Sequence, residues 1–139
     1  MNSKALNYLA LAKKGRLCEL GEEPVGDITR ALKGHLVLVA ADASDHTWRR
    51  AKSYVAGTDQ QALRVKFTKE ELGMAVGRQS LAIAAVTDPA LALALVNALG
   101  EPEKHKAIVE VLTAKAEKVK KRQAEAKAHQ RNVRKGKKK

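Results

Sequence analysis

The stretch LVLVAADAS, residues 36–44, begins with six consecutive apolar residues and ends with an aspartate, an alanine and a serine. The apolar residues do not alternate with polar ones, which predicts a strand that is covered on both faces. Ser44 stands where it can cap a following helix, and apolar residues then recur at helical spacing from Trp48 to Val55. We expect Asp42, at the end of the strand, to cap the same helix. A buried strand followed by an amphipathic helix is typical of α/β proteins.

The same alternation of strands and helices continues on both sides of this stretch. Helices on both faces of a parallel or mixed sheet are therefore predicted. In the second helix, we expect the buried face to comprise Val25, Ile28, Ala31 and Leu32. Strands are expected over 16–20, 36–41, 62–67 and 81–86, and helices over 4–13, between Gly21 and Gly34, from Ser44 to Gly57, from Thr68 to Gly77, from Asp88 to Gly100 and from Glu103 onward.

Composition narrows the class of protein. The 139 residues are 45% hydrophobic, which is enough for one compact core, and they include a single cysteine, Cys18. One cysteine excludes an intramolecular disulfide and a cysteine zinc cluster, and it fits a reducing compartment. No apolar run reaches the length that spans a membrane, and no signal-peptide cleavage site follows the first apolar residues. We therefore expect a cytoplasmic protein with a globular domain over 1–101 and a basic helix and flexible tail over 102–139.

Positive charge is concentrated at the C-terminus. The net charge is +12, and between Thr113 and Lys139 there are 12 lysines and arginines against 2 acids, whereas residues 1–112 carry 15 bases and 13 acids. The globular part is thus nearly neutral, and the strongly basic tail predicts a polyanionic partner. The tail has two other interpretations: a charged segment that only increases solubility, or a helix that binds a membrane surface. The tail lacks the large apolar residues that a membrane-surface helix requires. We expect helix as far as Ala128 and no order beyond it without a partner.

Five segments carry a resemblance to a known family. They are LALAKKGRL, GEE, LVLVAADAS, FTKEELGMAVG and LAIAAVTD, and together they span most of residues 4–100. They resemble the kink-turn RNA-binding ribosomal proteins, the family of archaeal ribosomal protein L-seven-Ae, eukaryotic L-thirty-e and the growth-arrest adaptors. The GEE segment makes the bacterial YlxQ-type branch the closer fit. The resemblance implies a three-layer α-β-α sandwich with a central mixed four-stranded sheet, no catalytic activity and no cofactor.

The resemblance also implies an RNA site at one end of the sandwich, formed by the turn before the second helix, the first turns of that helix and the loop after the fourth helix. Bent RNA exposes bases that side chains can reach, which a regular A-form groove hides. Where kink-turn readers carry asparagine, glutamate and lysine, this chain has Glu23, Pro24 and Asp27. A carboxylate can accept from base amino groups, but it cannot replace a lysine beside phosphates. The predicted RNA-binding residues are Lys14, Arg16, Gly21, Glu22, Glu23, Arg30, Lys33, Arg78 and Gln79 in the sandwich and Lys120, Lys121, Arg122, Arg131, Arg134 and Lys135 in the tail.

Two functions remain open at this point. The first is a non-catalytic RNA-binding protein of the ribosome or translation apparatus, which recognises structured, kink-turn-like RNA with the sandwich and phosphates with the tail. The second is a protein-interaction adaptor that has lost kink-turn recognition. We expect RNA as the partner, a monomer, no metal, and a ribosomal or translation-factor protein as a further partner. Trp48 is expected to face the core rather than to stack on a base.

Overall fold

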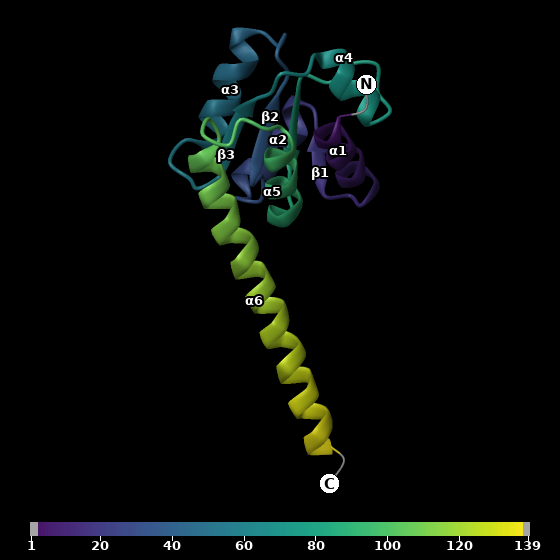
Figure 1. Ribbon diagram of the computed structural model, residues 1–139, viewed down its shortest axis with the longest axis vertical. Helices are drawn as coiled ribbons and strands as arrows, with labels where there is room; N and C mark the ends of the chain where they lie inside the picture. The colour runs from purple at the N-terminus through teal and green to yellow at the C-terminus, as the bar shows by residue number, and fades with distance from the viewer. Residues whose placement is uncertain (1–2, 138–139) are drawn as a thin grey trace.

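The computed structural model describes residues 3–137, with side-chain surroundings described as far as residue 128. The described residues form six helices and four strands that alternate along most of the chain (Figure 1). The elements are α1 (Lys4–Lys14), β1 (Cys18–Leu20), α2 (Glu22–Arg30), β2 (Leu36–Val39), α3 (Asp45–Val55), β3 (Gln61–Arg64), α4 (Lys69–Ala75), β4 (Ile83–Val86), α5 (Pro89–Ala98) and α6 (Lys106–Lys137).

The four strands form one mixed sheet in the order β1-β4-β2-β3. β2 and β3 are parallel, whereas β4 is antiparallel to both of its neighbours, β1 and β2. Helices α2 and α3 cover one face, α1 and α5 cover the other, and α6 packs on α5. Every residue of β2 and β4 is buried, as continuous apolar runs require. The predicted three-layer α-β-α sandwich is confirmed.

Helix α2 is shorter than predicted. It ends at Arg30, and the prediction that Ala31 and Leu32 are buried was wrong: both are exposed, and Leu32 adopts a φ of 62° with 61% of its surface exposed. The cause is tertiary: the N–H of Gly34 donates to Gln60 Oε1 over 2.8 Å, and a Cβ at Gly34 would lie only 2.7 Å from Thr29 Cγ2. This close approach draws the chain out of the helix before β2 begins.

The caps are as predicted with one correction. Ser44 caps α3 by accepting from the N–H of Thr47, and Thr68 begins α4 with a capping box that Glu71 completes. Asp42, which we expected to cap α3, instead accepts from the N–H of Lys69 over 2.8 Å and therefore caps α4. The reason is that β2 ends beside the start of α4, two elements that are separated in sequence by α3 and β3.

The sheet has two ends that matter for function. At the end that we call the glycine end, β1, β2 and β3 finish and β4 begins, so that Gly21 and α4 lie there. At the opposite end, which we call the basic end, β1, β2 and β3 begin and β4 finishes, so that Arg16, Lys33 and Thr87 lie there. α6 extends in the direction opposite to α4 and projects past the basic end (Figure 1).

α6 also runs further than the sequence predicted. It comprises 32 residues and continues beyond Ala128 to Lys137. Alanine, lysine, arginine and glutamine favour helix, and no proline interrupts the segment. At a rise of 1.5 Å per residue the helix is about 48 Å long. No helix in residues 3–137 is both long and apolar enough to cross a membrane.

Candidate nucleic-acid interface

The turn between β1 and α2 brings together two predicted site residues that are distant in sequence. Gly21 precedes α2 with a φ of 96°, a conformation that other residues rarely adopt, and its N–H donates to Ile83 O over 3.0 Å. A Cβ at Gly21 would lie 4.0 Å from Nη1 of Arg78. Arg78 and its neighbour Gln79 are exposed. The glycine end therefore presents a bare backbone turn beside a guanidinium group that has no ion-pair partner among the side chains of residues 3–128.

The loop that carries Arg78 is held against α4. The N–H of Arg78 donates to Gly73 O over 2.8 Å, and the N–H of Leu81, at the other end of the loop, donates to Lys69 O over 2.9 Å. A Cβ at Gly73 would lie 2.8 Å from both Arg78 O and Ser80 N. The backbones can approach this closely only because residue 73 is glycine. Gly73 thus fixes the position of Arg78 without exposing a side chain of its own.

The two glutamates after Gly21 differ in their surroundings. Glu22 Oε1 is screened from solvent and lies 3.6 Å from Arg50 Nε on α3. Glu23 is exposed at the start of α2, where an acid suits the helix dipole. Of the two predicted carboxylates, Glu23 is therefore the one on the open surface, whereas Glu22 faces α3.

Three other predicted residues lie at the basic end. Lys14 ends α1, Arg16 precedes β1 with a φ of 59°, and Lys33 precedes β2. All three are exposed, and none has an ion-pair partner within the side chains that the structure describes. Arg30 differs, because it pairs with Asp27 on the surface of α2.

Helix α6 is held at the basic end by a lysine that is largely, but not fully, buried. Lys115, with 12% of its side chain exposed, places Nζ 3.0 Å from Asp59 Oδ1 and 3.1 Å from His35 Nδ1. Burial, followed by the charge of Lys115, holds the pKa of His35 below its ordinary value, so the neutral ring accepts from the ammonium group. The hydrogen bond from Lys115 also lowers the pKa of Asp59. No sequence pattern indicates this cluster, since its residues come from three separate segments.

Beyond this anchor α6 leaves the sandwich. Leu112 is fully buried and Val119 is the last half-buried residue, whereas every residue over 120–128 is exposed. The helix from residue 120 to Lys137 extends about 27 Å at 1.5 Å per residue. The predicted cations Lys120, Lys121 and Arg122 are exposed on it. Arg131, Arg134 and Lys135 belong to the same helix, but their side chains lie outside the described residues.

The predicted site is therefore divided between opposite ends of the sheet. Gly21, Arg78 and Gln79 lie at the glycine end, whereas the free cations and α6 lie at the basic end. At the glycine end, acids balance several bases: Glu22 lies near Arg50, Asp45 Oδ1 lies 3.9 Å from Arg64 Nη2, and Glu101 pairs with Lys104 over 3.7 Å. The basic end has the larger excess of positive charge. The sequence contained a signal for this division, because Arg16 and Gly21 flank a single strand.

Among residues 3–128, whose side chains the structure describes, no cluster of three histidine, cysteine, aspartate or glutamate side chains could hold a metal ion. Trp48 is half-buried and packs against the core, as predicted. Arg64 and Lys52 approach its ring, each 5.6 Å from the centroid.

Comparisons with known proteins bear on the fold. No family model matches the chain, and no curated protein sequence matches it either. Solved structures do match. A protein of unknown function from Bacillus halodurans C is 24% identical with a TM-score of 0.66, over 70% of this chain and 98% of that one. The Giardia lamblia 15.5kD RNA binding protein is 18% identical with a TM-score of 0.59, over 78% of this chain and 93% of that one. The sandwich fold is thus shared with proteins of distant sequence.

Proposed function

We propose that this chain is a non-catalytic RNA-binding protein of the ribosome or translation apparatus. One observation carries the proposal: free cations gather at the basic end, where a long basic helix projects from the sandwich into solvent. Ordinary surface charges would be interspersed with acids, as they are at the glycine end. A helix whose lysines and arginines are exposed throughout residues 120–128 instead suits a surface of regularly spaced phosphates. The likeness in fold to a Giardia RNA binding protein supports RNA as the polyanion.

The two ends of the sandwich would contribute differently. Contacts between the basic end and phosphates release counterions, which gives affinity that depends steeply on salt and little on sequence. Recognition of a structured, kink-turn-like RNA would fall to the glycine end, where the bare turn at Gly21 and the side chains of Arg78 and Gln79 can meet unpaired bases. Gly73 supports that role by holding the loop in place.

The test is a chain shortened after Val119, with salt dependence of RNA binding as the measurement. Ending at Val119 keeps Leu112 and Lys115, which anchor α6, and removes ten lysines and arginines. If half of these contact phosphates, the slope of log affinity against log salt falls by about 4, at 0.7 to 0.9 per contact. A full-length variant in which the same ten bases are glutamine is the control, since it retains the helix and loses only charge.

An unchanged slope in both variants would exclude α6 as the phosphate-binding element.

For the glycine end, the affinity of Arg78→Ala is measured for a kink-turn RNA and for a straight duplex of the same length. We expect the variant to weaken binding to the kink-turn and to leave the duplex unaffected. Equal effects on both RNAs would refute shape recognition at this end.

A protein-interaction adaptor on the same fold is the alternative. It is favoured by the loss of free positive charge at α2, where Glu23 is exposed and Asp27 pairs with Arg30. An adaptor would capture its partner from a cell extract equally well after ribonuclease treatment, whereas RNA-dependent capture would disappear.

A further inference from the structure

β3 is an edge strand with one unpaired side. In the sheet order β1-β4-β2-β3 it has β2 as its single neighbour. The N–H groups of Gln61 and Val65 donate toward β2, to His35 O over 3.1 Å and Val39 O over 2.8 Å. Because successive residues of a strand point their backbone groups in opposite directions, those of Ala62 and Arg64 face outward. Within residues 3–137 no backbone hydrogen bond closes this edge.

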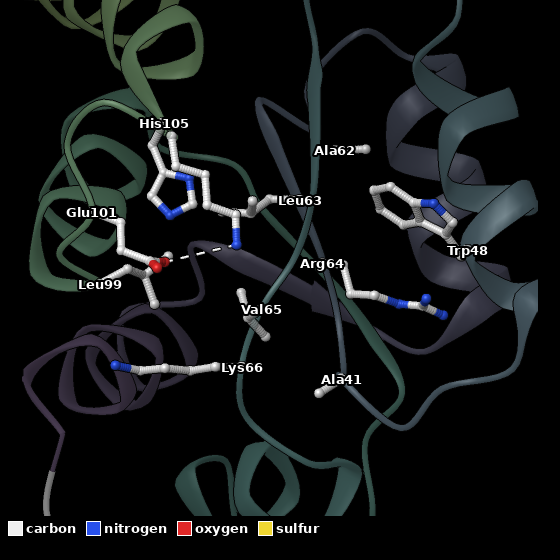
Figure 2. A pocket seen from close by; sticks show the side chains of 11 residues that line it. Ala41, Trp48, Ala62, Leu63, Arg64, Val65, Lys66, Leu99, Glu101 and His105 are labelled. Carbon is white, nitrogen blue, oxygen red and sulfur yellow. Dashed lines mark ion pairs between the residues drawn. The ribbon is translucent and has the colours of Figure 1, made fainter.

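A groove of about 460 Å³ follows the same edge (Figure 2). Trp48 lies on one side of the strand, and His105 and Leu99 lie on the other (Figure 2). Ala62 projects into the groove with only a methyl group, which leaves the backbone of β3 accessible. The groove therefore combines a row of free backbone donors and acceptors with apolar walls. An exposed edge of this kind is normally blocked by a charge pointing inward, a proline or a covering loop.

The charges around the groove are predominantly positive. Arg64, Lys66 and Lys104 line it, and Glu101, the acid among the lining residues, already pairs with Lys104 over 3.7 Å (Figure 2). Arg64 is tied to the Ala43 carbonyl by a hydrogen bond of 3.0 Å, and its Nη2 lies 3.9 Å from Asp45 Oδ1, so Lys66 is the lining cation that has no acidic partner among the described side chains. These cations flank the strand edge, so an acidic segment placed there would gain favourable contacts.

We propose that the edge of β3 is a docking site for an extended acidic peptide of a partner protein, which adds as a further strand. The free N–H and C=O groups of Ala62 and Arg64 would pair with the peptide backbone, which supplies affinity. Alternate peptide side chains would lie against Trp48 on one face and against Leu99 and His105 on the other. Acidic residues flanking the paired segment would meet Lys66 and Lys104.

Two other occupants fit the groove less well. A second copy of the chain that paired through its own β3 would bring Arg64 and Lys66 against the same cations, and like charges facing each other across strands are destabilising. A nucleic acid would satisfy the cations, but it has no backbone donors and acceptors at strand spacing. The row of unpaired amide groups is what distinguishes a peptide site from a phosphate site.

The experiment measures binding of a labelled eight-residue peptide to the full chain by fluorescence anisotropy. The peptide has two glutamates at each end and alternating valine and threonine between them. We expect saturable binding, which is lost when alternate peptide amides are N-methylated and weakened when lysine replaces the glutamates. Ala62→Pro removes one outward N–H and leaves the bonds to β2 in place, because proline is tolerated at the free side of an edge strand. It should weaken binding about tenfold, the equivalent of one lost main-chain hydrogen bond of ~1.4 kcal/mol.

Ala62→Ser is the matched control, since it keeps the N–H and a side chain nearly as small as that of alanine, and its affinity should stay near that of the unaltered chain. Lys66→Glu and Lys104→Glu test charge and should each weaken binding. Hydrogen exchange on the unaltered chain provides an independent readout that needs no variant: peptide should protect the amides of Ala62 and Arg64 and leave those of α1 unchanged. Absence of saturable binding, equal affinity of the proline and serine variants, or displacement of the peptide by single-stranded RNA would each overturn the proposal. Dimerisation through β3 in place of peptide binding would overturn it as well.

Discussion

Replacing Gly73 with alanine should destabilise the protein, although alanine is the better helix former. Gly73 lies inside α4, where glycine costs about 1 kcal/mol relative to alanine. A Cβ there would lie 2.8 Å from Arg78 O and Ser80 N and 2.9 Å from Ser80 Cα, all of them backbone atoms. The loop cannot move aside freely, because it is tied by the bonds of 2.8 Å from Arg78 N to Gly73 O and of 2.9 Å from Leu81 N to Lys69 O. The substitution therefore forces a packed backbone apart.

The size of the effect follows from two opposing contributions. Overpacking a close-packed site costs roughly 1 to 3 kcal/mol, and the gain in helix propensity offsets about 1 kcal/mol of it. Because all three atoms that the Cβ would meet belong to the backbone, the cost lies in the upper half of that range, roughly 2 to 3 kcal/mol. We therefore expect Gly73→Ala to lower the free energy of unfolding by about 1 to 2 kcal/mol, with a fall in Tm of roughly 3 to 8 °C. Urea unfolding is followed by the fluorescence of Trp48, the only tryptophan in the chain.

Gly26→Ala is a matched control, since Gly26 is also a buried glycine inside a helix. There a Cβ would meet Cζ and Oη of Tyr54, each at 3.3 Å, which belong to the free end of a side chain and can shift. This variant should be as stable as the unaltered chain or more stable by up to about 1 kcal/mol. The reasoning is refuted if Gly73→Ala is at least as stable as the unaltered chain and leaves the amide resonances of residues 78–80 unchanged.

Three further predictions concern pH, capping and charge. Burial holds the pKa of His35 below 6.5 in the folded chain, so the unfolded chain binds more protons below that pH. The contribution of His35 to the free energy of unfolding should therefore be complete above pH 6.5 and should decrease as the pH falls below it. His35→Asn or Lys115→Met should reduce this pH dependence in urea titrations at several pH values. Asp42→Ala should lower stability by about 1 kcal/mol, measured in the same way, because it removes the acceptor for the first N–H of α4. Arg16→Glu and Lys33→Glu should each weaken binding to a straight RNA duplex and reduce its salt slope by about 0.7 to 0.9, whereas unaltered slopes would place the phosphates elsewhere.

The order and type of the elements were predictable because each follows from local pattern. The apolar run that begins at Leu36 predicts a strand covered on both faces, and β2 is buried throughout. Ser44, Thr68 and Asp88 cap their helices with side chains that act within three residues. The concentration of charge in the tail is also a property of the sequence itself. Neither statement requires knowledge of which segments meet in space.

What the sequence left open was decided by contacts between distant segments. Asp42 caps α4 rather than α3 because β2 ends beside α4, and Lys115 reaches His35 and Asp59 only because α6 turns back along the sandwich to the basic end. The same geometry divided the predicted interface. Residue types determine what each group can bind, but the direction in which each strand crosses the sheet determines which groups can bind together, and that direction is fixed only when all four strands have paired.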